Sequence, residues 1–427
     1  MRRLVLLLAF VALPGIAAAQ EFDLLLKGGH VIDPRNGLSA VRDVAVKDGR
    51  IALVAADIAP ARALKTVDVS GHYVTPGLID IHVHFYAGEK DNEYSGGDRS
   101  LYPDGFTLRN CVTTVADAGS AGWRTFDDFR TRIIDRSRTR VLAFINIVGA
   151  GMAPGALEQN VEDMDVAATA AVARRHRDVV VGVKSAHYNG SDWIPYERAG
   201  AVARQLDLPV MVDFGGNVRA GRTLMDLFTK YFRAGDIYTH MYGGRRGEQD
   251  PDTKGPSAAM VEGRKRGIIF DVGHGGASFR FDAAVPMLKA GFVPDSISTD
   301  LHAGSMNTAM KGMINLMGKF MAMGLSLDDV IRQSTWNPAR QIKREELGHL
   351  SVGAPADIAV LKIETGSFGF IDPPGGRIAA SQRLSCELTV RDGKVLYDLN
   401  GLTREPWESL PPDARGGDPR WDGYSRR

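Results

Sequence analysis

The sequence predicts an α/β fold, a (β/α)8 barrel joined to a small β-sandwich that both chain ends build. The chain has 427 residues, of which 44% are hydrophobic, enough for a large buried core. Residues 76–343 alternate short apolar segments with helical stretches, the pattern of repeated βα units. The flanks, residues 20–75 and 344–402, contain short strands separated by turns rich in Gly and Asp, and residues 403–427 follow as a C-terminal tail.

Residues 1–19 have the layout of a secretory signal peptide. Arg2 and Arg3 precede an unbroken apolar run over residues 4–13, and residues 17–19 are small alanines suited to cleavage. The apolar run is too short to span a bilayer comfortably. We therefore expect a periplasmic or secreted protein that has no membrane contact once the signal is cleaved.

The overall charge argues against partners that bind through electrostatics. The formal net charge is +1 and charged residues make up an ordinary 24% of the chain. Nucleic-acid binding normally requires a strongly basic surface. A small-molecule substrate is therefore the expected partner, and a homo-oligomer stays open.

The two cysteines, Cys111 and Cys386, lie far apart in the sequence. Neither has a neighbouring Cys or His at the spacing of a metal site. We interpret them as two separate buried thiols, with a disulfide as the alternative that an exported location permits.

Eight apolar segments of the middle region are predicted to be the barrel strands. Most of them are nearly continuously apolar, as strands buried on both faces should be. They cover residues 78–84, 112–117, 141–148, 179–184, 209–213, 236–240, 268–273 and 296–300, and residues 196–206 and 326–335 are examples of the helices expected between or after them.

Ionisable residues recur at the carboxyl ends of these predicted strands. In a (β/α)8 barrel these ends meet on one face, where active sites lie. Packing alone does not explain ionisable groups at most of the eight ends. The residues are His84, Asp117, Lys184, Asp213, His240 and Asp300, with His274 just past the seventh strand.

The pair His82 and His84 forms the core of the predicted site. Alternate residues of a strand point to the same side, so both imidazoles can enter the barrel mouth. Imidazole nitrogens are common ligands of divalent metals. Asp80, two residues earlier, could orient one of these rings.

The stretch over residues 76–84, Pro-Gly-Leu-Ile-Asp-Ile-His-Val-His, resembles the strand-one signature of the amidohydrolase superfamily. The resemblance covers nearly the whole mature sequence. Residues 112–120, 238–240, 270–275 and 297–302 are most similar to its dihydroorotase-like branch of amidohydrolase/deacetylase metallohydrolases. It implies hydrolysis of amide or ester bonds by a hydroxide that one or two divalent ions activate, with zinc favoured and manganese as the alternative.

The resemblance also implies a set of metal ligands. His82, His84, Lys184, His240 and Asp300 match ligand positions of the superfamily. Lys184 is expected to be N6-carboxylated, so that the carbamate bridges two metals. Asp300 matches the catalytic aspartate, which takes a proton from the hydroxide and passes it on.

The fifth predicted strand departs from the family pattern. Asp213 stands where the superfamily has a ligating histidine. A carboxylate can also bind a divalent ion, so Asp213 is a predicted metal ligand. The alternatives are that Asp213 only supports the ligands, or that the second metal is weak or absent.

His274, His302 and Tyr86 are predicted to contact substrate. His274 lies among glycines that let a substrate approach closely, and His302 follows Asp300 by two residues. His187, three residues after Lys184, is a weaker candidate for the same mouth.

Tyr86 bears on the type of substrate. It occupies the position at which dihydroorotases carry an arginine that grips the substrate carboxylate, and a phenol cannot form that bidentate pair. The sequence therefore favours a deacetylase-like enzyme. A cyclic amidase or imidase of dihydroorotase type, or a catalytically inactive periplasmic binding protein on the same barrel, are the alternatives.

Overall fold

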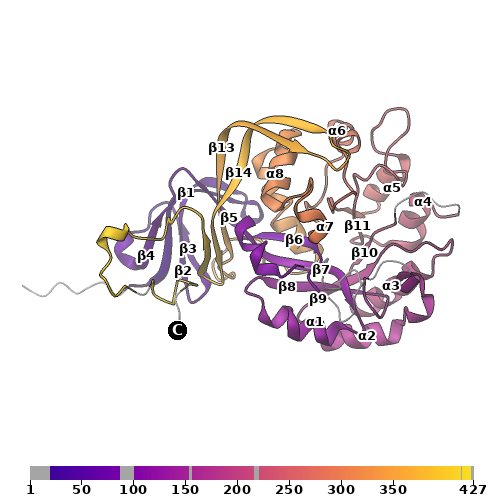
Figure 1. The fold of residues 1–427 in the computed structure, drawn as a ribbon, viewed down its shortest axis with the longest axis horizontal. Helices are drawn as coiled ribbons and strands as arrows, with labels where there is room; N and C mark the ends of the chain where they lie inside the picture. The colour runs from indigo at the N-terminus through magenta and orange to yellow at the C-terminus, as the bar shows by residue number, and fades with distance from the viewer. Residues whose placement is uncertain (1–19, 87–100, 153–155, 216–220, 415, 425–427) are drawn as a thin grey trace, which may run out of the picture.

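The computed structural model describes residues 20–86, 101–152, 156–215, 221–414 and 416–424, and the predicted signal peptide lies outside these residues. A β-rich part and a barrel lie side by side (Figure 1). Within the described ranges, no helix is both long enough and apolar enough to cross a membrane.

Both chain ends contribute to one sheet of eight strands, in the order β15-β14-β13-β5-β1-β2-β3, with β4 paired to β1. Val74 of β5 lies opposite Val360 of β13, which joins the two ends directly. Leu24 and Leu26 share a core with Val360, because alternate residues of a strand face one side. The strands are β1 (Phe22–Asp33), β2 (Leu38–Lys47), β3 (Arg50–Ala55), β4 (Ala63–Asp68), β5 (Tyr73–Pro76), β13 (Ile358–Ile371), β14 (Arg377–Arg391) and β15 (Lys394–Asp398).

Residues predicted to form a C-terminal tail also join this sheet. The backbone amide of Val395 in β15 donates to the carbonyl of Trp421 at 2.8 Å, and that of Gly423 donates back to Val395 at 3.0 Å. Trp421 is 6% exposed and belongs to the core of the sheet. The tail therefore contributes to the β-rich part rather than trailing from it.

The barrel contains seven regular parallel strands in chain order. The segment predicted as the eighth strand is irregular. Single bridges, Ser296 to Asp271 and Leu301 to Val83, and a few backbone hydrogen bonds connect it to its neighbours. These bridges place it between β12 and β6, so it closes the barrel. The regular strands are β6 (Leu78–Val83), β7 (Val112–Gly122), β8 (Arg140–Asn146), β9 (Val180–Ser185), β10 (Val210–Val212), β11 (Ile237–Tyr238) and β12 (Ile269–Phe270).

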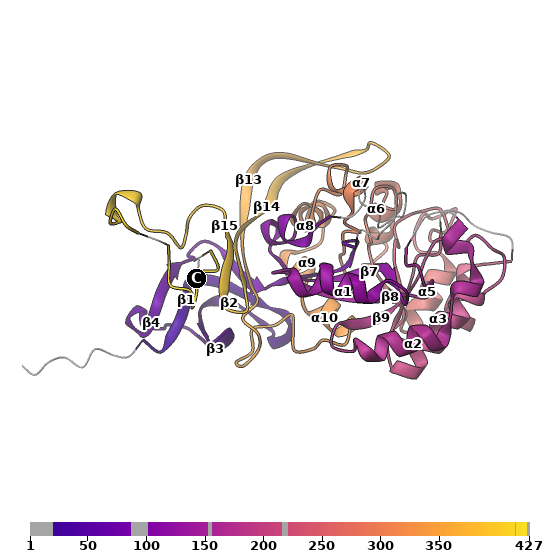
Figure 2. The same ribbon diagram turned by 60° about the horizontal axis from the view of Figure 1, so that its bottom comes forward.

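Helices cover the outside of the barrel, with α1, α2 and α3 running along β7, β8 and β9 (Figure 2). In α3 the residues Ala199, Val202 and Ala203 are buried, the spacing of one helix face. Ser326 caps α9 by accepting a hydrogen bond from the amide of Asp329. The helices are α1 (Phe126–Arg132), α2 (Val166–Arg175), α3 (Ile194–Leu206), α4 (Leu224–Asp226), α5 (Ala258–Lys265), α6 (Phe281–Lys289), α7 (Ala303–Met306), α8 (Met313–Ala322), α9 (Leu327–Arg332) and α10 (Trp336–Gln341).

The hairpin of β13 and β14 extends from the β-rich part over the barrel, beside α8 (Figures 1 and 2). There Cys386 of β14 forms a disulfide with Cys111, which directly precedes β7, and their Cα atoms are 5.6 Å apart. The interpretation of the cysteines as separate thiols was therefore wrong. A separation of 275 residues conceals the contact, since it depends on how the hairpin lies on the barrel.

Removing this cross-link is expected to destabilise the protein. The Cys111→Ala/Cys386→Ala variant should lose about 2–4 kcal/mol of unfolding free energy, because the bond restricts a very long loop in the unfolded chain. Guanidinium unfolding with and without dithiothreitol measures the effect. The reductant should shift the midpoint of the natural protein and leave the double variant unchanged. Equal midpoints for both proteins would contradict the prediction.

Candidate metal centre

Six predicted ligands converge at the carboxyl ends of the barrel strands. The strands place His82 and His84 at the end of β6, Lys184 in β9, Asp213 after β10, His240 after β11 and Asp300 in the closing segment. All six residues are between 0% and 8% exposed. They line one cavity of about 250 Å³ together with His187 and His302.

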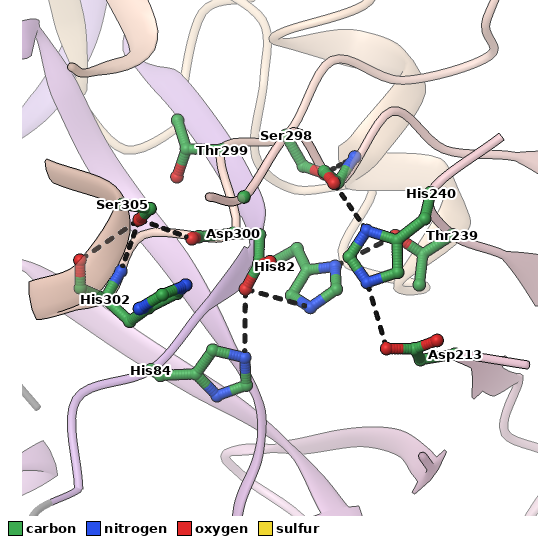
Figure 3. A network of polar contacts seen from close by, with 12 residues as sticks. His82, His84, Asp213, Thr239, His240, Ser298, Thr299, Asp300, His302 and Ser305 are labelled. Carbon is green, nitrogen blue, oxygen red and sulfur yellow. Dashed lines mark hydrogen bonds and ion pairs between the residues drawn. The ribbon is translucent and has the colours of Figure 1, made fainter. Parts of the chain in front are cut away.

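His82, His84 and Asp300 form a first cluster of ligand atoms. Oδ1 of Asp300 lies 3.2 Å from Nε2 of His84 and 3.6 Å from Nε2 of His82, and Figure 3 shows both rings turned toward the carboxylate. Ligands about 2.0–2.2 Å from one ion lie roughly 3–3.5 Å from each other. The first cluster therefore fits a divalent metal, and its ligand atoms all lie within 4.8 Å of one another.

The hydrogen bonds around His82 fix which nitrogen faces the cavity. Thr239 donates its hydroxyl hydrogen to Asp271 at 2.8 Å, so it must accept from Nδ1–H of His82 at 2.9 Å. The lone pair on Nε2 of His82 therefore points into the site. Burial, aided by Lys184, lowers the pKa of His82 to about 3 and keeps the ring neutral.

The other two predicted histidine ligands are held in the same way. Nδ1 of His84 lies 2.9 Å from the hydroxyl of Ser120, and Nδ1 of His240 contacts the carbonyl of Gly273. Each ring is thus tied to the protein through Nδ1, which leaves Nε2 for a metal.

Asp80 does not orient either imidazole, in contrast to our expectation. Its Oδ1 accepts hydrogen bonds from the backbone amides of His82 at 3.2 Å and Thr299 at 3.1 Å. Asp80 therefore ties β6 to the closing segment, and burial raises its pKa to about 7. The sequence prediction missed Thr239 and Asp271, which hold the His82 ring from distant strands.

Asp213, His240 and His187 form a second cluster. Oδ2 of Asp213 lies 3.2 Å from Nε2 of His240 and 2.9 Å from Nε2 of His187. Its Oδ1 accepts from the amide of Gly215 at 2.9 Å and from Arg246 at 3.1 Å. Burial alone would raise the pKa of Asp213, but the two histidines and Arg246 hold it well below its ordinary value. One oxygen is thus anchored and the other faces the cluster.

Lys184 is fully buried, and its Nζ lies 3.2 Å from Nε2 of His82. Burial lowers the pKa of its ammonium, while Asp213 and Asp300 oppose that shift. Gly119 makes room for the side chain, because a Cβ there would lie 2.6 Å from Cβ of Lys184. This glycine was not recognised as part of the site from sequence.

The predicted substrate residues are not all brought together. His302 lines the cavity, whereas Tyr86 and His274 do not. The hydroxyl of Tyr86 donates to Asp128 at 2.8 Å. His274 stacks on Phe279 and its Nε2 lies 2.7 Å from Nζ of Lys319. Tyr86 and His274 were assigned to the substrate from family positions and, for His274, from neighbouring glycines. Neither signal specifies where a side chain points, and neither residue lines the metal cavity.

Comparison with known proteins identifies the family. The model of the amidohydrolase family matches residues 280–396. A deacetylase of Brucella anthropi is 31% identical over 332 residues, which covers 76% of this chain and 80% of that protein. A solved adenine deaminase has a TM-score of 0.80 and 26% identity, covering 88% of this chain and 100% of that one. A solved dihydroorotase has a TM-score of 0.75 and 28% identity, and the match covers 88% of this chain and 99% of the dihydroorotase chain. The chain therefore belongs to the amidohydrolase family and is a metal-dependent hydrolase.

Proposed function

We propose that this protein is an exported, deacetylase-like hydrolase that removes an acyl group from an amide or ester of a small molecule. The first cluster carries the proposal, because three buried ligand atoms with the spacing of one coordination sphere face a common cavity. Zinc or manganese bound there would lower the pKa of a water molecule and polarise the carbonyl. Asp213 and His240 are the proposed ligands of a second ion.

Lys184 is the proposed bridge between the two ions. An ammonium directed at Nε2 of His82 would repel a metal at that nitrogen. An N6-carboxylated Lys184 would instead present a carboxylate, whose two oxygens share one negative charge, to the two clusters. Its burial and its position in β9, between the strands that carry His82 and Asp213 in the barrel, support this proposal.

Asp300 is the proposed proton carrier. It is the most exposed of the six ligands, at 8%, and its Oδ1 is directed at the two histidines. A side chain at Gly275 would collide with Oδ2 of Asp300, so this glycine keeps that oxygen accessible. Oδ2 can therefore accept a proton from the attacking water and deliver it to the leaving group.

Arg245 favours acylated substrates that carry a carboxylate. A second cavity, of about 190 Å³, shares His187 and Asp213 with the metal cavity and is lined by Arg245 and Arg246. Arg246 forms an ion pair with Asp213. Arg245 is exposed, and it has no ion pair with any residue in the described ranges. Its guanidinium can therefore pair with an anionic group of the substrate.

The Arg245→Ala variant should bind such substrates more weakly. We expect KM for N-acetyl amino acids to rise about 10- to 100-fold, the value of one charge-assisted hydrogen bond. KM for a neutral acyl ester should stay constant, which serves as the internal control. Steady-state kinetics on both substrates measures the difference. An equal rise in KM for both substrates would contradict a contact between Arg245 and the substrate carboxylate.

A substrate screen tests the proposed reaction. The mature protein, stripped with a chelator and reloaded with zinc or manganese, is offered N-acyl amino acids, acyl esters and cyclic imides. We expect release of the acyl group from the first two classes. Preferred opening of cyclic imides would favour the dihydroorotase-type alternative. Binding without turnover by metal-loaded protein would favour the inactive binding protein.

The disulfide supports the proposed export. Bonds of this kind persist in the periplasm and outside the cell, whereas the cytosol keeps thiols reduced. Cell fractionation should find the protein, cleaved near residue 19, outside the cytoplasm. Recovery of the full-length chain from the cytoplasm would refute this part of the proposal.

A further inference from the structure

His187 resembles the predicted metal-binding histidines in the way it is held. Its Nδ1 lies 2.9 Å from Oε2 of Glu158, and its Nε2 lies 2.9 Å from Oδ2 of Asp213. The rings of His82, His84 and His240 are likewise anchored through Nδ1 and directed inward through Nε2. A histidine that binds a metal commonly donates its other ring N–H to a carboxylate.

Glu158 is buried although it lies in a short 3-10 helix, Ala156–Gln159, between β8 and β9. It is 1% exposed, and its Oε1 has no hydrogen-bond partner among the described residues. Burying a carboxylate is unfavourable unless it is paired. Its contact with His187 therefore compensates for burial and at the same time fixes the orientation of the ring.

The backbone of His187 also has an uncommon conformation. Its φ is +54°, in the left-handed region that residues other than glycine seldom adopt. Such a conformation persists where surrounding contacts enforce it, often at a functional site. Here it turns the chain after β9 so that the ring reaches the cavity, which His187 lines.

We infer that His187 supplies the imidazole ligand of the second metal, in place of the histidine that strand five lacks. The inference rests on the proposed second ion at Asp213 and His240. Asp213 contributes an oxygen where the family has a nitrogen, and His187 contributes a nitrogen from the loop after β9. Oδ2 of Asp213 lies 2.9 Å from Nε2 of His187 and 3.2 Å from Nε2 of His240, so one carboxylate oxygen faces both ring nitrogens.

Metal stoichiometry tests this inference without relying on activity. Chelator-stripped protein is reloaded with zinc, dialysed, and measured by elemental analysis and calorimetric titration. The natural protein should bind two equivalents. His187→Ala and His187→Gln should each bind one. The glutamine variant can still donate a hydrogen bond to Asp213, so a second equivalent retained by it would mean that His187 only orients the carboxylate.

A rescue experiment distinguishes lost ligation from lost folding. Asp213→His returns an imidazole to strand five, so the double variant His187→Ala/Asp213→His should regain the second equivalent. Glu158→Gln should weaken the second site about 10- to 100-fold, the usual effect of losing the partner of a ligating histidine. His176→Ala is the matched control, since His176 also contacts a carboxylate, Asp127 at 2.6 Å, outside the cavity.

The outcomes separate this inference from the proposed function. If the natural protein binds no metal, the proposed function fails. If the natural protein and His187→Ala both bind one equivalent, the first cluster stands and the inference about His187 is wrong. If both bind two equivalents, the second site does not need His187 and the inference is again overturned.

Discussion

His82→Ala and His84→Ala are each expected to lose most bound metal at the first cluster and about 10³-fold or more of kcat/KM. The two rings supply two of the three ligand atoms there, and the Nε2 atoms of both lie within ion-pair distance of Asp300. Because both side chains are buried, solvent cannot readily take their place. Elemental analysis of the purified variants and kinetics on an acyl substrate measure the two losses.

Two comparisons make this experiment specific. His72→Ala changes a histidine in the β-rich part, where Nδ1 contacts the carbonyl of Ser70, and should retain metal and activity. Circular dichroism should show the same fold in all variants. Full metal content in the His82→Ala/His84→Ala double variant would refute the assignment of the first cluster.

The convergence of the ligands could be predicted because it depends on local pattern. Each ligand follows or ends an apolar segment, and the carboxyl ends of parallel strands meet on one face of a barrel. His82, Lys184 and His240 therefore reach the predicted cavity although their side-chain contacts could not be foreseen. The two-residue turn at Asp392 and Gly393 was predictable for the same reason, and both residues have the required positive φ, 47° and 76°.

Features that depend on contacts between distant segments were missed. Thr239 holds the ring of His82 across 157 residues, and the cysteines pair across 275. No periodicity in either segment encodes such a contact. The same holds for Glu158, which contacts His187 from a separate 3-10 helix, Ala156–Gln159.

Residues just beyond a strand were predicted least well. Tyr86 and His274 were assigned from a family position and from neighbouring glycines, and neither signal specifies the direction of a side chain once the strand has ended. Tyr86 follows the end of β6 and turns to Asp128, and His274 lies after Gly273, whose φ is +47°. The segment around Asp300 likewise departs from a regular strand, and Ile297 is the one apolar residue of positions 296–300.

Lys184→Ala is expected to have the second large effect. If Lys184 carries a carbamate, its loss removes the anionic bridge between the clusters, and we expect the loss of one metal equivalent and about 10³-fold of kcat. Elemental analysis and kinetics measure this. The shortened side chain also leaves a space in the buried site, beside Gly119.

That space allows a chemical rescue that a merely structural lysine would not show. Acetate or propionate can enter it and present a carboxylate where the carbamate stood, so added acid should restore metal content and rate together in Lys184→Ala. Lys184→Met fills the same volume without a carboxylate and should resist rescue, which makes it the matched control.

An ordinary lysine that only balances the charges of Asp213 and Asp300 would give a different pattern. Metal binding would then survive in Lys184→Met, because a neutral side chain leaves both carboxylates free to attract the ion, and short acids would inhibit rather than rescue. Retention of both metal equivalents in Lys184→Met would therefore refute the carbamate, as would electron density for an unmodified amine in the metal-loaded protein.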